Sequence, residues 1–270
     1  MLTYEVLTKI KSSGASSISL SLDGAFKETH DAIRGRIGTY DKTIETIRNA
    51  LRLGLKAQVN TAIMKRNFEE LPQILHLIRK LGVRIWELFF LVQVGRGTVV
   101  EDLTPEEYES VCNFLYDASH YGVTIRCVEA PFVRRIARQR IEQGDYWDHE
   151  SYRKLRRCLV ESVGNHTSAS TLRPSGTLDG DGIIFVAYDG AVYPGGFLPI
   201  GIGDVRKDPL VRIYRENDLL RSIRQRRLNG YCGICRFRDL CGGSRARAFS
   251  HTGDPLSSDP ACILTRRMAS

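Results

Sequence analysis

The chain has 270 residues, 42% of them hydrophobic and 26% charged, a composition typical of a globular protein rather than a disordered or fibrous one. No stretch approaches the roughly 18 apolar residues needed to cross a bilayer, and the start lacks the layout of a secretory signal, so we expect a cytoplasmic protein without membrane contact. The net charge of +8 includes arginine clusters, but solvated helix faces explain these and no nucleic-acid-binding motif accompanies them, so we expect no nucleic-acid partner.

The first half of the chain alternates between the periodicities of strands and helices. The pattern predicts strands at 15–24, 55–64, 83–94 and 123–130, and helices at 39–54, 67–82 and 104–122. Thr104 is a good N-cap with Pro105 at the first helical position. Asn67 is expected to cap the helix 67–82, with Glu70 completing a capping box.

Short strand-helix-strand connections of this kind imply a parallel sheet with right-handed crossovers and helices outside it. In such sheets the chemistry lies at the carboxyl ends of the strands. We therefore expect functional residues in the loops after Leu22, Met64 and Val94.

The sequence changes character near residue 130. A basic helical stretch leads into a connector rich in Ser, Thr and Gly, and two short strands then flank a hairpin turn at Asp189-Gly190. We therefore divide the chain into an alternating strand-helix portion at 1–129, a helical arm and connector at 130–179, and a cysteine-bearing module at 180–270.

Four of the seven cysteines, Cys232, Cys235, Cys241 and Cys262, form the pattern C-x2-C-x5-C-x20-C. Thiolates that converge in glycine-bearing loops can hold a metal ion or an iron-sulfur cluster, and a reducing cytosol favours such a site over disulfides. A structural zinc site usually pairs two C-x2-C elements, whereas one is present here. The spacing favours a 4Fe-4S cluster and leaves zinc as the alternative.

Both ends of the sequence resemble radical S-adenosylmethionine (SAM) enzymes. The segments "SLDGAFKETHDAIRG", "YDKTIETIRNALRLG" and "NTAIMKRN" are similar to the second half of the radical SAM barrel. The stretch from "DGAVYPGGF" through "YCGICRFRDLCGGSRARA" to "DPAC" is similar to the SPASM or twitch module that carries auxiliary clusters, in particular in relatives of the haem-synthesis branch. The resemblance implies an α/β fold: the C-terminal part of a partial (β/α)6 TIM-like barrel, followed by a small SPASM/twitch iron-sulfur module.

Carried over by residue, the resemblance implies that the four cysteines are the ligands of an auxiliary 4Fe-4S cluster. A further auxiliary cluster would need thiolates where this chain has Gly195 and Arg245, so we expect it to be absent. Cys127 and Cys158 are expected to be structural thiols, and Cys158 is the better outside candidate for a ligand.

The resemblance also implies a SAM site at the strand ends. Ser21 and Asp23 match positions near bound SAM, Asn60 is a weaker candidate, and residues 91–97 would supply backbone groups to the adenine edge. The same Ser-Leu-Asp-Gly sequence is also a good strand-ending turn, and this structural interpretation stays open.

The family's defining C-x3-C-x2-C motif is not in this sequence, in which no cysteine precedes Cys112. We therefore expect the chain to be the C-terminal portion of such an enzyme, unable to cleave SAM by itself. We also expect it to be poorly soluble or to bind a chain that supplies the missing barrel strands.

In the complete form, the resemblance implies a SAM-binding 4Fe-4S cluster, hydrogen abstraction by a 5'-deoxyadenosyl radical, and electron transfer through the auxiliary cluster. The implied partners are a tetrapyrrole or peptide-like substrate and an electron donor such as flavodoxin or ferredoxin. The alternative is a non-catalytic iron-sulfur or zinc-binding subunit or adaptor. An RNA-binding protein would instead show steeply salt-dependent binding through its arginine clusters.

Overall fold

The computed structural model describes residues 2–93, 102–165, 168–172 and 178–266. The chain forms two compact units, each made of several segments. The barrel unit comprises residues 1–90, 110–128 and 143–173, and the cysteine unit comprises 91–109, 129–142 and 174–270. The segment 130–179, expected as a separate arm, contributes residues to both units.

A four-stranded parallel sheet organises the barrel unit. Its strands are β1 (Ser17–Ser21), β2 (Lys56–Ile63), β3 (Ile85–Phe90) and β4 (Thr124–Val128), hydrogen-bonded in the order β1-β2-β3-β4. The register places Ser21 opposite Asn60 and Asn60 opposite Glu87. The parallel arrangement expected from the sequence is confirmed.

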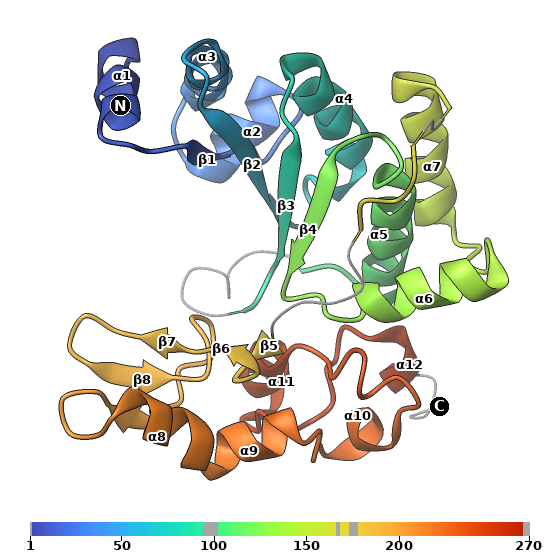
Figure 1. Cartoon of the computed structure of the whole chain (residues 1–270). Helices are drawn as coiled ribbons and strands as arrows, with labels where there is room; N and C mark the ends of the chain where they lie inside the picture. The colour runs from blue at the N-terminus through green and yellow to red at the C-terminus, as the bar shows by residue number, and fades with distance from the viewer. Residues whose placement is uncertain (1, 94–101, 166–167, 173–177, 267–270) are drawn as a thin grey trace. The chain divides into compact units, whose positions relative to one another are not determined.

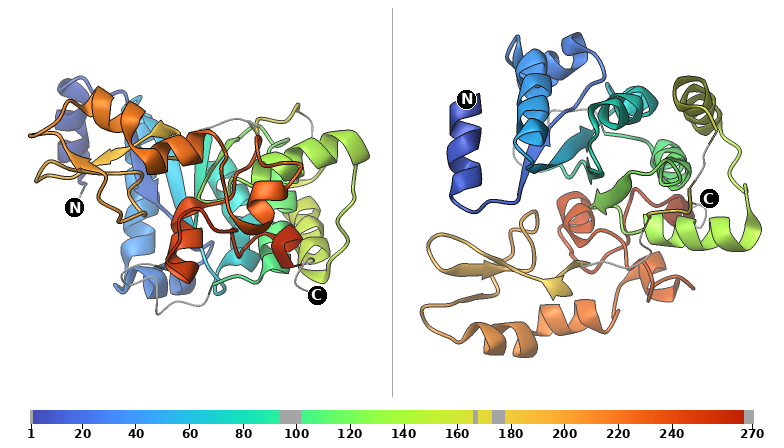
Figure 2. Two further views of the ribbon diagram at one scale, coloured as in Figure 1. Left: turned by 90° about the horizontal axis from the view of Figure 1, so that it is seen from below. Right: turned by 45° about the horizontal axis from the view of Figure 1, so that its top comes forward.

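Helices alternate with these strands along the chain: α1 (Tyr4–Ser12), α2 (Lys27–Arg34), α3 (Thr39–Arg52), the short 3-10 helix η1 (Phe68–Glu70), α4 (Leu71–Leu81), α5 (Pro105–Ala118) and α7 (Glu150–Val163). The helices α3, α4 and α5 lie on one side of the sheet (Figures 1 and 2). The side chains of Val59, Trp86 and Leu88 are fully buried on that side. Alternate residues of β2 and β3 therefore build the core, as the period of two requires.

Local signals explain the start of α5 but not that of α4. Thr104 donates its backbone N–H to Glu107 Oε2 at 2.9 Å, and Glu107 N–H donates to Thr104 Oγ1 at 3.3 Å, so this helix begins with a reciprocal capping box.

The expected capping box of Asn67 and Glu70 is wrong. Asn67 makes no cap hydrogen bond, and Glu70 instead accepts hydrogen bonds from Ala25 N–H at 2.8 Å and from a nearby threonine hydroxyl.

Asn67 is fully buried and joins two strand ends. Its Nδ2 donates to the carbonyls of Asp23 at 2.8 Å and Ala62 at 2.7 Å, and its Oδ1 accepts from Met64 N–H at 2.9 Å. Without Asn67, backbone groups at the ends of β1 and β2 would be buried without hydrogen-bond partners. Three buried hydrogen bonds contribute more to the free energy of folding than one exposed helix cap, so the side chain turns inward.

The cysteine unit is built from short elements. They are α6 (Val133–Gln143), β5 (Leu178–Asp179), β6 (Gly182–Ile183), β7 (Phe185–Val186), β8 (Ala191–Tyr193), β9 (Gly203–Asp204), α8 (Leu210–Glu216), α9 (Asp218–Arg224), α10 (Gly230–Ile234), α11 (Arg245–Thr252) and α12 (Ile263–Arg266). Strands β7, β8 and β9 form an antiparallel sheet, and the expected hairpin turn joins β7 to β8. Val92, Leu198 and Ala246 form a small apolar core.

Within the described residues, the helices are too short or too polar for any of them to cross a bilayer.

Candidate functional site

The four cysteines of the C-terminal pattern line one cavity in the cysteine unit, together with Tyr231 and Phe237. Cys232 lies in α10, Cys235 ends that helix, Cys241 follows the next turn, and Cys262 immediately precedes α12. All four are free thiols, and Cys235 is the one that is only partly buried. The cavity brings together residues separated by as many as 30 positions, as a shared ligand site requires.

Backbone amides point at three of these sulfurs. Phe237 N–H donates to Cys235 Sγ, Gly243 N–H to Cys241 Sγ and Asp259 N–H to Cys232 Sγ, each at 3.4 Å. N–H···S bonds to cysteine sulfur stabilise negative charge and tune iron-sulfur sites. The loops therefore surround three of the sulfurs with hydrogen-bond donors, whereas a cysteine that only fills the core has apolar neighbours.

Burial sets the protonation of these thiols. It raises the pKa of Cys232, although the Asp259 N–H bond acts in the opposite direction, and it raises the pKa of Cys262 to about 11. The buried Cys241 is shifted in the same direction for the same reason. Neutral thiols are therefore favoured until a cationic centre binds and displaces the protons.

Glycine is required beside the thiols. Gly243 has φ of +67°, and a β-carbon there would lie 2.6 Å from Arg245 Nη2 and 3.2 Å from Cys232 Sγ. Real β-carbons essentially never approach another atom to 2.6 Å, and the left-handed backbone adds its own cost for other residues. The Cys-Gly-Gly sequence thus lets the chain fold tightly against the cysteine cavity.

Arg245 and Asp259 hold the loop that carries the last cysteine. The Nη1 atom of Arg245 donates to the carbonyls of Pro255 at 2.9 Å and Ser257 at 2.7 Å. The Asp259 Oδ2 atom accepts from Ser244 N–H at 2.7 Å. Both side chains are almost fully buried, so these bonds fix the loop in a low-dielectric interior.

At Gly195 and Arg245, where a further cluster would need thiolates, the structure holds ionisable side chains, Asp179 and Arg245. A β-carbon at position 195 would overlap the Asp179 carboxylate, which fills that space. Burial raises the pKa of Asp179 to about 7, the Glu129 carboxylate raises it as well, and the Arg245 guanidinium lowers it. The absence of a further auxiliary cluster stays a prediction.

The four thiols at the cysteine cavity are ligands of the kind that bind zinc or an iron-sulfur cluster. Four thiolates bound to one zinc at about 2.3 Å would bring their sulfurs to within about 3.8 Å of one another in a tetrahedron. Across the described ranges, no three His, Cys, Asp or Glu side chains converge in the way that a single ion requires. Four thiols around one cavity supply the number and the kind of ligands that either a 4Fe-4S cluster or a tetrahedral zinc ion takes.

Asp23, one of the residues expected at a SAM site, makes contacts at the strand ends. Its Oδ1 accepts from Ala62 N–H at 2.8 Å, its Oδ2 pairs with the Arg34 guanidinium, and its N–H donates to His30 Nδ1 at 3.0 Å. The side chain is fully buried. Burial raises its pKa, and Arg34 lowers it. Both carboxylate oxygens have partners within the fold, and the expected contact of Asp23 with SAM stays a prediction.

Ser21 and Asn60 belong to a polar row that crosses one face of the sheet. Gln58 Nε2 donates to Asn60 Oδ1 and to Glu87 Oε2, each at 2.8 Å, and Arg126 Nη1 donates to Gln58 Oε1 at 3.3 Å. The row is partly exposed, whereas the residues between its members are buried under the helices. We call these five residues the polar row. The alternation of polar and apolar residues along β2 and β3 was visible in the sequence. The hydrogen bonds that join the polar side chains of neighbouring strands could not be predicted from it.

The remaining sequence candidates contribute little. Residues 94–97 of the expected adenine-edge segment lie outside the described residues. Cys158 lies in α7 of the barrel unit, where its Sγ is 3.8 Å from Ser162 Oγ, and Cys127 lies in β4.

Comparisons with known proteins agree with this architecture. Residues 1–78 match the family model of the radical SAM superfamily. The chain is 33% identical over 265 residues to a protein of Methanosarcina barkeri named AdoMet-dependent heme synthase, covering 97% of this chain and 72% of that protein.

Solved structures show the same fold. The structure of anSMEcpe with bound AdoMet superposes with a TM-score of 0.62 at 15% identity, covering 99% of this chain and 69% of that one. Streptococcus suis SuiB bound to its precursor peptide SuiA gives a TM-score of 0.62 at 12% identity, covering 97% of this chain and 57% of SuiB. The extended similarity to the Methanosarcina protein, the family match and the shared fold show that this chain belongs to the radical SAM superfamily.

Proposed function

We propose that this chain is part of a radical SAM iron-sulfur oxidoreductase and that its cysteine unit is a SPASM/twitch-like module holding an auxiliary 4Fe-4S cluster. The observation that carries the proposal is the cavity lined by Cys232, Cys235, Cys241 and Cys262, with three amides directed at its sulfurs. Four cysteines would fill the protein-facing coordination sites of such a cluster. This arrangement favours electron transfer over direct binding of substrate to iron.

In a radical SAM enzyme, SAM and a further 4Fe-4S cluster would together supply the chemistry that removes a hydrogen atom from the substrate. Oxidation of the substrate then requires the loss of one more electron, for which the cysteine site is the proposed acceptor. A flavodoxin or ferredoxin would supply the electron that initiates the reaction.

The polar row is the proposed surface for polar groups of SAM or of the substrate. It offers the exposed Arg126 guanidinium and the amides of Gln58 and Asn60 at one face of the sheet. A guanidinium and amides suit carboxylate and peptide groups. A tetrapyrrole or peptide-like substrate is also supported by the relatives, one named a heme synthase and another bound to a precursor peptide.

The cluster is tested by anaerobic reconstitution of the 270-residue chain with iron and sulfide. We expect a brown protein with broad visible absorption and about four irons per chain. Cys235→Ser should lose the absorption and most of the iron, because one ligand is missing. Cys158→Ser is the matched control, since this thiol lies in α7 and its replacement should leave the iron content unchanged.

Two outcomes contradict the proposal. Equal iron contents in the two variants would show that the four-cysteine cavity is not the ligand set. A colourless protein that retains one zinc per chain would support the non-catalytic zinc-binding subunit or adaptor instead.

A further inference from the structure

A basic pocket opens at the amino ends of β3 and β4, the opposite ends of these strands from the candidate SAM loops. Its volume is about 430 Å³, within the range of small-molecule sites. The lining residues come from α4, the residues before β3, the connection from α5 to β4, and the segment after α7: His76, Arg79, Lys80, Gly82, Val83, Arg84, Tyr121, Gly122, Val123 and Ser168. We call this the basic pocket.

Cations dominate the basic pocket and acids are missing from it. Arg79, Lys80 and Arg84 carry permanent positive charges at neutral pH, and none of the lining residues is Asp or Glu. Within the described part of the chain, no carboxylate forms an ion pair with these three side chains. The nearby Asp117 is not a lining residue and accepts the Tyr152 hydroxyl at 2.8 Å.

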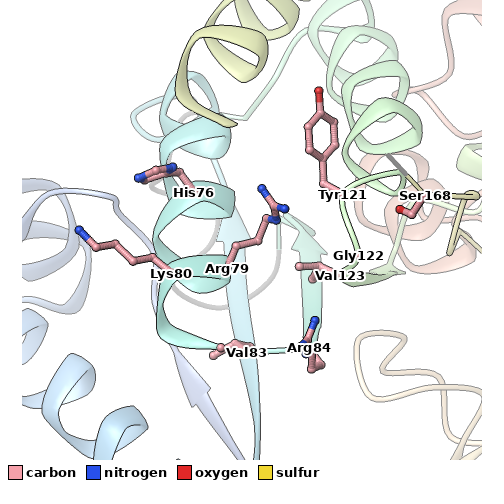
Figure 3. A pocket seen from close by; sticks show the side chains of 10 residues that line it. His76, Arg79, Lys80, Val83, Arg84, Tyr121, Gly122, Val123 and Ser168 are labelled. Carbon is pink, nitrogen blue, oxygen red and sulfur yellow. The ribbon is translucent and has the colours of Figure 1, made fainter. Parts of the chain in front are cut away.

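The side chains of Tyr121 and Arg79, which line the pocket, are held in place by their neighbours. Tyr121 is 6% exposed, and its hydroxyl donates to the Gly164 carbonyl at 2.9 Å. The Arg79 guanidinium lies over the Tyr121 ring, 5.6 Å from its centre. Figure 3 shows Arg79 and Tyr121 reaching toward the same space, with Arg84 below them. A guanidinium stacked on a ring keeps its N–H edge free to donate, so this contact holds Arg79 in place without using its donors.

Helix capping alone does not account for these charges. Basic residues are common in the last turn of a helix, where they interact with the dipole, and Arg79 and Lys80 occupy that turn of α4. However, the terminal carbonyls of Ile78 and Arg79 already accept from Val83 and Gly82 N–H at 2.9 and 3.0 Å. Arg84 lies outside the helix, so its placement at the same pocket needs another explanation.

We propose that the basic pocket binds a pyrophosphate group, either as free pyrophosphate or as part of a nucleoside diphosphate. Phosphate oxygens only accept hydrogen bonds, and the side chains of Arg79, Lys80 and Arg84 only donate them. Arginine forks bind phosphate in a bidentate manner, and three cations around one space match a ligand with several negative charges better than a single carboxylate.

The test is isothermal titration calorimetry of the full chain with pyrophosphate, ADP and citrate at constant ionic strength. We expect saturable binding of pyrophosphate or ADP, and the tighter of these two probes identifies the source. Arg79→Gln with Arg84→Gln should weaken binding about a hundredfold, because two charge-assisted contacts are lost. The control removes the same charge from exposed positions on α3, with Lys42→Gln and Arg52→Gln, and should bind as the parent chain does.

Three results would overturn the proposal: no saturable binding of either phosphate probe, equal weakening in the two double variants, or citrate binding as tight as that of pyrophosphate. A thermal melt checks the fold of each variant. If the double variant is misfolded, Arg84→Gln alone decides the question, because the Arg84 side chain makes no hydrogen bond or ion pair within the described residues, and it should still weaken binding about tenfold.

Discussion

The replacement Asp179→Asn tests the buried carboxyl that fills the space beside Gly195. The Oδ2 atom of Asp179 is enclosed and has no hydrogen-bond partner within the described residues. Burial raises the pKa of Asp179 to about 7, and the neighbouring Glu129 carboxylate adds to the effect. The protonated form is therefore favoured in the folded chain below about pH 7, and an asparagine reproduces its shape without its titration.

The size of the effect follows from the two pKa values. In the unfolded chain Asp179 should titrate near its ordinary value of 3.8, and in the folded chain near 7. Between these values the folded state binds more protons than the unfolded state, so stability falls as the pH rises. The difference between the two pKa values corresponds to a loss in the free energy of unfolding on the order of 4 kcal/mol. This is an upper limit because the residue is partly exposed, and the loss is complete above about pH 7.

The assay is urea unfolding of the metal-free chain under anaerobic conditions, followed by circular dichroism between pH 5 and 8. Asp179→Asn should flatten the decline in the free energy of unfolding and should be more stable than the parent chain at pH 8. Asp204→Asn is the control, since hydrogen bonds from Arg206 lower the pKa of Asp204 to about 2, and its protonation does not change in this range. A decline as steep in Asp179→Asn as in the parent chain would refute the reasoning.

Three further replacements test the two units. Gly243→Ala should abolish iron binding because its β-carbon would lie 2.6 Å from a buried guanidinium nitrogen, whereas Gly253→Ala, with φ of +75° and open space around it, should retain the iron; iron per chain decides. Arg34→Gln should lower the free energy of unfolding by about 2–3 kcal/mol at pH 7, because it leaves the buried Asp23 carboxylate without its cation. In urea unfolding, the difference in free energy between the variant and the parent chain should shrink as the pH falls and the Asp23 carboxyl protonates. Asn67→Ala should cost about 2–4 kcal/mol in the same measurement by removing three buried hydrogen bonds, and a loss below 1 kcal/mol would contradict its role in joining the strands.

Local signals in the sequence were enough to predict the alternating elements of the barrel unit. Strand and helix periodicities depend on neighbouring residues, and short connections between them leave a parallel sheet as the natural arrangement. The N-cap role of Thr104 was predicted from the sequence, whereas the returning bond from its N–H to the Glu107 carboxylate was found only in the structure. The cysteine spacing predicted that the four thiols lie together, and they line one cavity in the structure.

Tertiary structure decided the partners of the polar side chains. Asn67 had the local signature of an N-cap, but its amide bonds the Asp23 carbonyl, 44 positions away. Asp179 gave no sequence signal, because its position depends on the absence of a β-carbon at Gly195. Burial makes an unpaired polar group more costly than a lost cap or turn, so long-range packing overrides local preference at these positions. The sequence alone thus determined the alternating elements and the grouping of the cysteines, whereas the folded chain determined which partners the polar side chains find.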